Sequence, residues 1–264
     1  MIRVTNLIKK YGDFTAVNDI SFEVAAGEIF AFLGPNGAGK TTTIKILTTL
    51  LKPTSGQVEL DGLNPAVQQN EARKRFGIVF QDPSLDDELT AYENMDFHGV
   101  LYKVPAKIRA ERIERLLTLF ELWDRRNDPV KQFSGGMKRR LEIARGLLHT
   151  PRIVFLDEPT LGLDPQTRNQ LWSHVQKLNQ EEGVTVFMTT HYMEEAERVA
   201  QRIAIIDHGK IVAQGSAEQL KVQTGAGTLE QAFLALTGST IRQEDANSLD
   251  QMRNMARMFR GNRR

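Results

Sequence analysis

Hydrophobic positions in the first third of the chain form short runs, some continuous and some alternating with polar residues, as is typical of β-strands. Turns containing Gly12 and Gly27 separate the first of these runs. A glycine-rich loop then leads into a stretch with helical periodicity, 41–51, which Pro53 and Gly56 end. In this part of the chain we predict strands at 2–7, 20–24, 28–33, 57–60 and 76–80.

The pattern changes after position 88. Apolar residues at helical spacing among charges, such as Ile113, Leu116 and Phe120, predict helices between 90 and 122. We interpret 88–150 as a helical lobe inserted into the domain. Buried-strand patterns then return on either side of a helical run, as in a strand–helix–strand unit of a parallel sheet. We predict later strands at 153–156, 184–188, 202–207 and 211–213, and helices at 165–179, 217–223 and 229–236.

The loop between the strand at 28–33 and the helix at 41–51 carries the most specific chemical motif. Its sequence, GPNGAGKT from Gly34 to Thr41, fits the pattern G-x-x-x-x-G-K-[ST]. Such a loop wraps its backbone N–H groups around phosphate oxygens, and the following helix adds its positive dipole end. Lys40 is expected to reach the β- and γ-phosphates, and the Thr41 hydroxyl to ligate Mg²⁺. Because a strand precedes the loop and a helix follows it, we prefer a P-loop to a chance glycine turn.

Two carboxylates follow the apolar strand at 153–156. Asp157 stands at the strand end, where a P-loop NTPase holds its Mg²⁺. Glu158, one residue on, points elsewhere and is a candidate to orient or deprotonate the attacking water. Alone, the sequence Asp-Glu-Pro also fits a turn or a helix N-cap. Beside a P-loop the catalytic interpretation is favoured.

Four further features are weaker when taken singly. The segment 134–136, Ser-Gly-Gly, begins a helical run and offers a second anion site, although an ordinary serine N-cap is the simpler interpretation. His191 and Gln81 each follow a strand, where a polar side chain can face a γ-phosphate, but a loop histidine is more often solvated. Tyr11 follows the first strand and can stack on adenine or be an ordinary, partly buried aromatic residue.

Composition narrows the class of protein. The 264 residues include 34 basic and 33 acidic side chains, so the formal charge of +1 gives no reason to expect general nucleic-acid binding. The absence of cysteine excludes disulfides and thiolate metal sites. The first residues lack the apolar region of a secretory signal, and no apolar run reaches the about 18–20 residues of a membrane span. We therefore expect a chain of the reducing cytoplasm that depends on another chain wherever a membrane must be crossed.

Taken in order, these residues resemble the ATP-binding subunits of ABC transporters, from about residue 2 to residue 238. The matching elements are the adenine-stacking Tyr11, the Walker A loop Gly34–Thr41, the coupling-loop Gln81, the signature at 133–137, the Walker B Asp157 with catalytic Glu158, the D-loop at 162–164 and the switch His191. Seven elements in the right order are more specific than any one of them. The resemblance implies an α/β P-loop NTPase fold with a RecA-like core sheet, an N-terminal antiparallel β part and a helical lobe, within a domain at 1–238.

The resemblance also implies the residues of the site. For ATP binding it implies Tyr11, Gly34, Pro35, Asn36, Gly37, Ala38, Gly39, Lys40, Thr41 and Thr42. For catalysis it implies Glu158, His191, Gln81 and Lys40, and for Mg²⁺ it implies Thr41, Gln81 and Asp157. In this family two subunits pack head to tail, so a second copy is expected to receive the signature residues Ser134, Gly135 and Gly136 and the D-loop Asp164.

The signature departs from the family's usual LSGGQ, because Phe133 stands first and Met137 last. The serine hydroxyl, the glycine backbone and the helix dipole do the physical work, so a terminal methionine need not abolish activity. The Ser-Gly-Gly-Met form, with the runs 139–145 and 233–238, looks like the daunorubicin-resistance-type and polysaccharide- or lipid-export ATPases. Those typically pair with a separate ABC-2-type membrane subunit, which would hold this chain at the cytoplasmic face of the cell membrane.

Two rival classes remain beside transport. Soluble ABC ATPases of DNA repair or translation usually carry a long coiled coil or two tandem ATPase halves, and neither is visible here. A GTPase or kinase would lack the signature before the Walker B strand and His191 after the next strand. We prefer transport, by fold-level analogy.

The tail at 239–264 turns from polar to basic. After Asp250 it contains no acidic residue, and Met252, Met255 and Phe259 recur at helical spacing among five arginines. One interpretation is a short helix that docks on anionic lipid or on a neighbouring subunit. The other is a solvated chain end.

Overall fold

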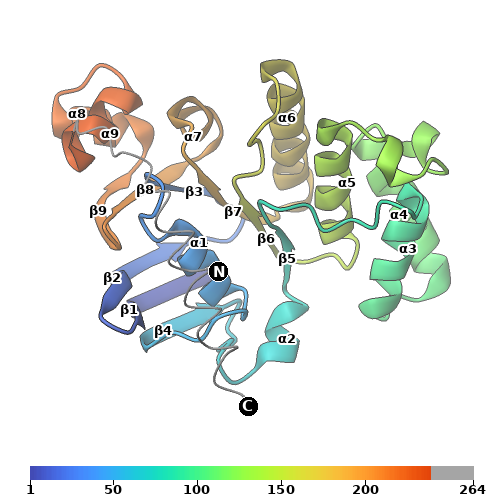
Figure 1. The fold of residues 1–264 in the computed structure, drawn as a ribbon, viewed down its shortest axis with the longest axis horizontal. Coiled ribbons are helices and arrows are strands. Elements are labelled where there is room, and N and C mark those ends of the chain that lie inside the picture. Colours follow the sequence, from blue (N-terminus) through green and yellow to red (C-terminus); the bar gives the residue numbers. More distant parts are fainter. Residues whose placement is uncertain (239–264) are drawn as a thin grey trace, which may run out of the picture.

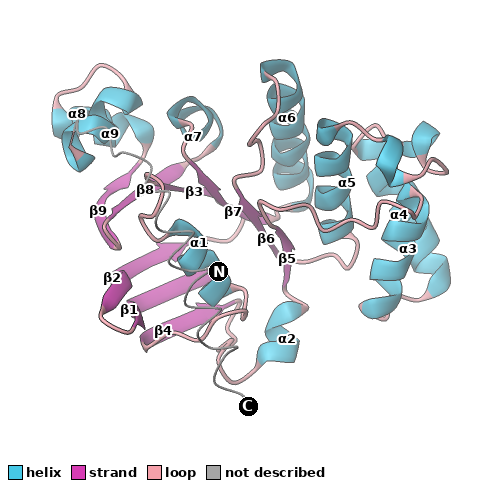
Figure 2. Ribbon diagram, viewed as in Figure 1, coloured by secondary structure: helices cyan, strands magenta, loops and turns pink. Residues whose placement is uncertain are grey.

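Two β-sheets form the framework of the computed structural model, which describes residues 1–238 (Figures 1 and 2). The strands are β1 (Ile2–Tyr11), β2 (Phe14–Val24), β3 (Ile29–Leu33), β4 (Ser55–Leu60), β5 (Phe76–Val79), β6 (Ile153–Asp157), β7 (Thr185–Thr190), β8 (Arg202–Asp207) and β9 (Lys210–Gly215). The smaller sheet is antiparallel, in the order β2-β1-β4. The larger has the order β5-β6-β7-β3-β8-β9, and only β9 runs antiparallel to its neighbour. This confirms the predicted α/β class with an antiparallel part.

A cluster of phenylalanine rings joins the two sheets. Phe22 from β2 contacts Phe30, Phe32 and Phe187 on the larger sheet, with ring centroids 5.5–5.9 Å apart. Helix α1 (Lys40–Leu47) adds buried aliphatic side chains to the same core and lies between the sheets in Figure 1. Because aromatic side chains bury large apolar areas, this core fixes where α1 begins relative to the strand ends of the larger sheet.

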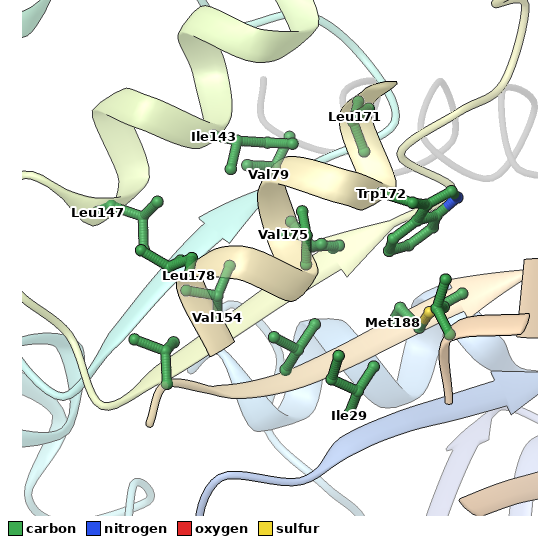
Figure 3. Close-up of a cluster of buried hydrophobic side chains, with 14 of the residues drawn as sticks. Ile29, Val79, Ile143, Leu147, Val154, Leu171, Trp172, Val175, Leu178 and Met188 are labelled. Carbon is green, nitrogen blue, oxygen red and sulfur yellow. The ribbon is translucent and has the colours of Figure 1, made fainter. Parts of the chain in front are cut away.

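Helix α6 (Pro165–Glu182) covers the opposite face of the larger sheet, as Figure 3 shows. Its apolar side chains recur at helical spacing and meet strand residues and helix α5 (Gly135–Leu147) in one buried cluster. The labelled members are Leu171, Trp172, Val175 and Leu178 from α6, Ile143 and Leu147 from α5, and Ile29, Val79, Val154 and Met188 from the strands. The cluster therefore ties the signature helix α5 to the same sheet that carries the P-loop.

The helical lobe lies to one side of the sheet, beside β5 (Figure 1). It contains α3 (Ala91–Leu101), α4 (Ala106–Leu119), the 3₁₀ turns η1 (Trp123–Arg125) and η2 (Val130–Gln132), and α5. A capping box fixes the start of α3, since the Thr90 hydroxyl accepts from the Glu93 N–H and the Glu93 carboxylate accepts from the Thr90 N–H. The buried side chains of the lobe belong to the same hydrophobic cluster as α6 and the face of the larger sheet; they include Met95, Ile113, Leu116, Leu117, Phe120, Leu122 and Val130.

Several predicted boundaries were wrong. The strands β1 and β2 extend to Tyr11 and back to Phe14, because they pair along their whole length through bulges that disturb the alternating pattern. The helix predicted at 41–51 ends at Leu47, and Thr49 then takes a positive φ of 66°. Helices α2 (Gln69–Arg73) and α7 (Met193–Val199) were not predicted, since five and seven residues are too short for a clear periodic pattern.

Helices α8 (Ala217–Thr224) and α9 (Leu229–Thr237) close the described part of the chain next to β9. Both begin at hydroxyl side chains, Ser216 and Thr228, that accept a hydrogen bond from the first helical turn. Among the helices of residues 1–238, none combines the length and hydropathy of a membrane span. The interpretations of the basic tail at 239–264 lie outside the described residues.

Candidate active site

The loop between β3 and α1 approaches its neighbours so closely that two of its positions accept only glycine. A Cβ at Gly34 would lie 2.4 Å from the carbonyl oxygen of Ile206, and one at Gly39 would lie 2.6 Å from that of Ala16. Gly39 also has a φ of 110°, which L side chains rarely adopt. The loop therefore wraps tightly just before α1 begins at Lys40, as a loop that surrounds phosphate with N–H groups must.

The Lys40 ammonium is buried at the start of α1. Its Nζ donates to the carbonyl of Gly34 at 2.6 Å and to that of Pro35 at 3.3 Å. It also lies 3.3 Å from Oε1 of Glu158, and both side chains are less than a tenth exposed. A buried charge of this kind requires partners. The pair therefore places a positive charge at the wrapped loop and a carboxylate directly opposite it.

Asp157, the last residue of β6, is almost completely buried. Its Oδ1 accepts a hydrogen bond of 2.6 Å from the Thr189 hydroxyl on the neighbouring strand β7. Burial raises the pKa of Asp157, and the hydroxyls of Thr189 and Thr41 offset this only in part. Ionisation of a buried carboxylate is costly unless a cation lies beside it. Mg²⁺ bound next to phosphates takes such a carboxylate together with a threonine hydroxyl. Thr41 and Asp157 therefore fit a magnesium ion.

Glu158 holds a strained backbone conformation immediately after the strand. Its φ is 48°, and a positive φ in a non-glycine residue persists only where its surroundings enforce it. Here Thr189 does so, because the Glu158 N–H donates both to the Thr189 carbonyl at 3.2 Å and to its hydroxyl at 3.0 Å. One threonine thus fixes Asp157 and Glu158 together, and the turn sends their carboxylates in different directions.

The Glu158 carboxylate joins Lys40 to His191. Its Oε2 lies 2.7 Å from Nδ1 of His191, whose ring packs on that of Tyr192 with centroids 4.0 Å apart. Burial opposes ionisation of Glu158, but the His191 hydrogen bond and the Lys40 charge outweigh it and hold the pKa of Glu158 below its usual value. An ionised, buried carboxylate with a fixed orientation can take a proton from a water molecule.

The signature segment forms a second, separate feature on the lobe. Ser134 is the N-cap of α5, and its hydroxyl accepts from the Met137 N–H at 3.3 Å. Ser134 and Gly135 are exposed, so the helix N-terminus faces outward. A Cβ at Gly136 would lie 2.5 Å from the Thr167 side chain, so the glycine allows α5 to approach the start of α6.

The D-loop meets the signature at that contact. Asp164 caps α6 by accepting from the Thr167 N–H at 3.0 Å and from its hydroxyl at 2.5 Å. These two hydrogen bonds lower the pKa of Asp164. Within residues 1–238 no hydrogen bond or ion pair connects Ser134 or Asp164 to Lys40. The two features are therefore separate in the chain: Lys40 is enclosed, whereas Ser134 faces outward.

Two predicted site residues stand apart from the buried group. Gln81 follows β5 at the same edge of the sheet as Asp157, but it is exposed and, in the part that the structure describes, makes no hydrogen bond to Thr41 or Asp157. Tyr11 is half-buried at the end of β1, with Nζ of Lys9 5.0 Å from its ring centroid. The ligand roles of Gln81 and Tyr11 stay predictions.

Three residues of the site were not found from the sequence. Thr189 reads only as one of two threonines after the strand predicted at 184–188, Arg139 only as one charge in a basic helix, and Glu195 only as one acid in a run. In the structure Arg139 bonds the turn that contains Glu158. Glu195 is buried and accepts from the Thr160 hydroxyl at 2.7 Å. A buried polar role of this kind depends on the three-dimensional neighbours and leaves no periodic pattern.

A P-loop with a buried lysine, a carboxylate pair on the adjacent strand and a serine-capped helix on a lobe together define the ABC class of P-loop ATPases. The family model described as ABC transporter matches residues 17–161. The daunorubicin resistance ATP-binding protein DrrA3 of Streptomyces coeruleorubidus is 39% identical over 252 residues, covering 91% of this chain and 79% of that one. The linearmycin resistance ATP-binding protein LnrL of Bacillus subtilis (strain 168) is 41% identical over 231 residues, covering 88% and 74%. The chain belongs to the ABC transporter family.

Solved structures extend the comparison to the reaction. One, the ATP-binding subunit of an ABC transporter, has a TM-score of 0.81 at 29% identity and covers 89% of this chain and 99% of that one. Another, the dimeric post-hydrolysis state of the ATP-binding cassette MJ0796 bound to ADP and Pi, has a TM-score of 0.73 at 31% identity, with 82% and 98% covered. The chain is therefore an ATP-binding subunit with ABC-type ATP hydrolase activity, and the resemblance inferred from its motifs is confirmed.

Proposed function

We propose that this chain hydrolyses MgATP at the cytoplasmic face of the cell membrane and drives a separate, ABC-2-type membrane subunit of an exporter. The observation that carries the hydrolytic part is the buried Lys40–Glu158–His191 group next to Asp157. Lys40 begins α1, Asp157 and Glu158 lie at the end of β6, and His191 directly follows β7, so the group lies at one edge of the larger sheet, where ligands of α/β proteins bind.

Each side chain has a distinct task in this mechanism. The P-loop N–H groups and Lys40 bind the phosphates, and Thr41 and Asp157 hold the metal. Mg²⁺ bound there neutralises charge that develops on the phosphate oxygens. Glu158 accepts a proton from the attacking water, and His191 keeps the carboxylate oriented through its 2.7 Å hydrogen bond. Gln81 lies after the neighbouring strand β5, and in this mechanism it ligates the metal and couples the site to the membrane subunit.

We further propose that two copies complete each other's sites. The exposed N-terminus of α5 at Ser134 offers a hydroxyl, glycine N–H groups and a helix dipole to an anion. The P-loop of the same chain has no bond to it within the described residues. Dimeric cassettes among the structural relatives support a second ATPase subunit. The γ-phosphate would join the halves, and hydrolysis would release them.

The transport part rests on the relatives and on the lobe surface. Proteins named for resistance to daunorubicin and linearmycin cover most of this chain. On α3, Phe97, Val100 and Leu101 are large, apolar and exposed, as in a surface that another protein covers. The alternative is a soluble ABC ATPase without transport. The test is whether a neighbouring reading frame encodes a multi-spanning membrane protein. Copurification of that membrane protein with this chain, and ATP turnover coupled to transport in the complex, would favour the exporter over the soluble ATPase.

The hydrolytic proposal is tested with Glu158→Gln. The amide can still orient a water molecule but cannot take its proton, so turnover should fall by about 10²–10⁴-fold while ATP binding persists. Dimers should then accumulate in MgATP, measured by size-exclusion chromatography with light scattering. Glu194→Gln is the matched control, because Glu194 is exposed on α7 and should behave as wild type. Near-normal hydrolysis by Glu158→Gln would show that Glu158 is not the base.

A further inference from the structure

Arg139 makes an unusually complete set of bonds in the interior between α5 and the larger sheet. Its Nε donates to the Pro159 carbonyl at 2.8 Å, and one terminal nitrogen donates to the carbonyls of Asp157 at 3.0 Å and Glu158 at 3.2 Å. The other donates to the Phe80 carbonyl and, at 3.0 Å, to the carboxylate of Glu142. Since a guanidinium has five N–H donors, every donor has an acceptor.

The four carbonyls share a position in the fold. All lie at or just beyond the carboxyl ends of the adjacent strands β5 and β6. Phe80 immediately precedes Gln81, and the other three form the turn that holds Asp157 and Glu158. The Glu158 carbonyl also accepts from the Leu161 N–H at 3.2 Å, but the guanidinium bonds to all four carbonyls at once and so helps to set the conformation of both strand ends.

Glu142 extends this connection to the segment after Gln81. One of its carboxylate oxygens accepts from Arg139, and the other accepts from the Ser84 N–H at 2.7 Å and the Ser84 hydroxyl at 3.2 Å. Arg145 holds the same residue from the next turn of α5, donating to the Ser84 carbonyl at 2.8 Å and to its hydroxyl. Side chains of α5 therefore form hydrogen bonds both to the turn at 157–159 and to Ser84 in the segment after Gln81.

We propose that Arg139 and Glu142 are a positioning pair that couples the two ATP sites of the dimer, an inference that rests on the proposed composite sites. Ser134 at the start of α5 acts on the partner's nucleotide, whereas the turn bound by Arg139 acts on the chain's own. Ser134 and Arg139 are five positions apart, a rise of roughly 7–8 Å along a rigid helix. When the partner's ATP draws Ser134 into place, α5 carries Arg139 with it and sets the position of Glu158.

The geometry of the Arg139 bonds favours an all-or-none response of the catalytic turn to movement of α5. The planar guanidinium holds its acceptors in a fixed fork, so a shift of α5 disturbs several charge-assisted bonds together. A lysine at this position has three donors on one point charge and cannot span both strand ends. Misplacement of a reacting group by about 1 Å can slow a reaction by about 10²-fold.

The test compares Arg139→Lys with Arg140→Lys in the full-length protein. Arg140 is the adjacent, mostly buried arginine, and it donates to the Phe120 carbonyl and to Glu121 within the lobe. ATP affinity is measured with a fluorescent ATP analogue, and turnover is measured against ATP concentration. Arg139→Lys should keep the affinity within about twofold, lower kcat by about 10- to 100-fold and reduce the Hill coefficient to about 1. Arg140→Lys should keep the kcat and cooperativity of the wild type.

Other outcomes separate the possible failures. If Arg139→Lys retains wild-type kcat and Hill coefficient, the pair does not position the site. If both arginine variants lose turnover in proportion to a lower melting temperature, Arg139 is only structural. Glu142→Gln provides a second variant of nearly the same shape, and it should show a smaller loss of kcat and of cooperativity; unchanged cooperativity in it also contradicts the proposal. Failure of the composite site itself is recognised separately, because Glu158→Gln would then not dimerise in MgATP.

Discussion

The P-loop edge of the larger sheet and the signature end of the lobe, both of which we propose bind phosphate, are organised in opposite ways. At the sheet edge, Lys40, Asp157 and Glu158 are buried, and each is bonded to another of the three, to neighbouring backbone or to the Thr189 hydroxyl. At the lobe, Ser134 and Gly135 are exposed, and the serine hydroxyl accepts only from its own helix among the described residues. One half is preorganised by internal charge pairs, and the other is an open helix end.

The difference follows from the cost of burying charge. A buried lysine or carboxylate is stable only with partners, so the sheet edge must hold its charges in a fixed network before nucleotide arrives. A helix N-terminus carries no full charge and can remain solvated without penalty. In the composite site that we propose, the chain keeps the chemically demanding half within one molecule and offers the other half to a partner.

Removing the charge of the closed half should have the largest effect. In Lys40→Ala the phosphates lose a charge-assisted partner, and the affinity for ATP should fall by about 2–3 kcal/mol, or roughly 30- to 150-fold. Turnover should disappear with it. Isothermal titration calorimetry measures the affinity, and Lys45→Ala, an exposed lysine on the same helix, is the control. Unchanged ATP binding by Lys40→Ala would contradict the P-loop assignment.

The open half should respond differently. Ser134→Arg places a long cation where the partner's γ-phosphate is expected, so it should block hydrolysis while the isolated subunit still binds ATP. Mixing it with Lys40→Ala sharpens the comparison, because a mixed dimer contains one site with an intact P-loop and an intact signature. Partial recovery of ATPase activity in the mixture is the expected result. Normal hydrolysis by Ser134→Arg alone would rule out the composite site.

The sequence predicted the elements and residues of the closed half, around Lys40 and Asp157, but not the hydrogen bonds that join them. The strand, the glycine loop and the helix around Lys40 follow from local periodicity and turn chemistry, and Asp157 follows from its place after a buried strand. The hydrogen bonds of Thr189 and Arg139 join segments far apart in the chain, so no local pattern indicates them. The same reason explains why Gln81 was placed correctly at a strand end without any indication that it would be exposed.

Acid should weaken the contact between the helical lobe and the start of β5 in the larger sheet. His149, just after α5, bonds the Phe76 carbonyl at 3.0 Å and stacks on Tyr102. Burial, with the Arg112 charge, lowers the pKa of His149 to about 4, and burial near Arg145 lowers that of His98 to about 3. Because the unfolded chain takes up protons below about pH 6.5 and the folded chain does not, stability is full above that pH and falls as pH drops toward about 4.

Replacing the titrating ring tests this expectation. His149→Gln keeps a donor near the Phe76 carbonyl but cannot be protonated, so urea unfolding should show a smaller loss of stability between pH 7 and 4, by about 1–2 kcal/mol. His208→Gln is the control, since the His208 side chain is 80% exposed. An acid dependence in His149→Gln as steep as in the wild type would mean that other groups control it.

The smallest effect is expected from restoring the usual last residue of the signature. The backbone N–H of Met137 donates to Ser134, while its side chain packs, partly buried, against the core cluster. Met137→Gln keeps that N–H, so turnover should change by no more than about twofold, with a slight loss of stability from reduced apolar packing. Ser134→Ala is the contrast, because it removes the hydroxyl and costs about 1 kcal/mol as a cap as well as a phosphate contact. Equal losses of kcat in the two variants would show that the side chain at 137 takes part in the site, and the open half would then depend on more than backbone and dipole.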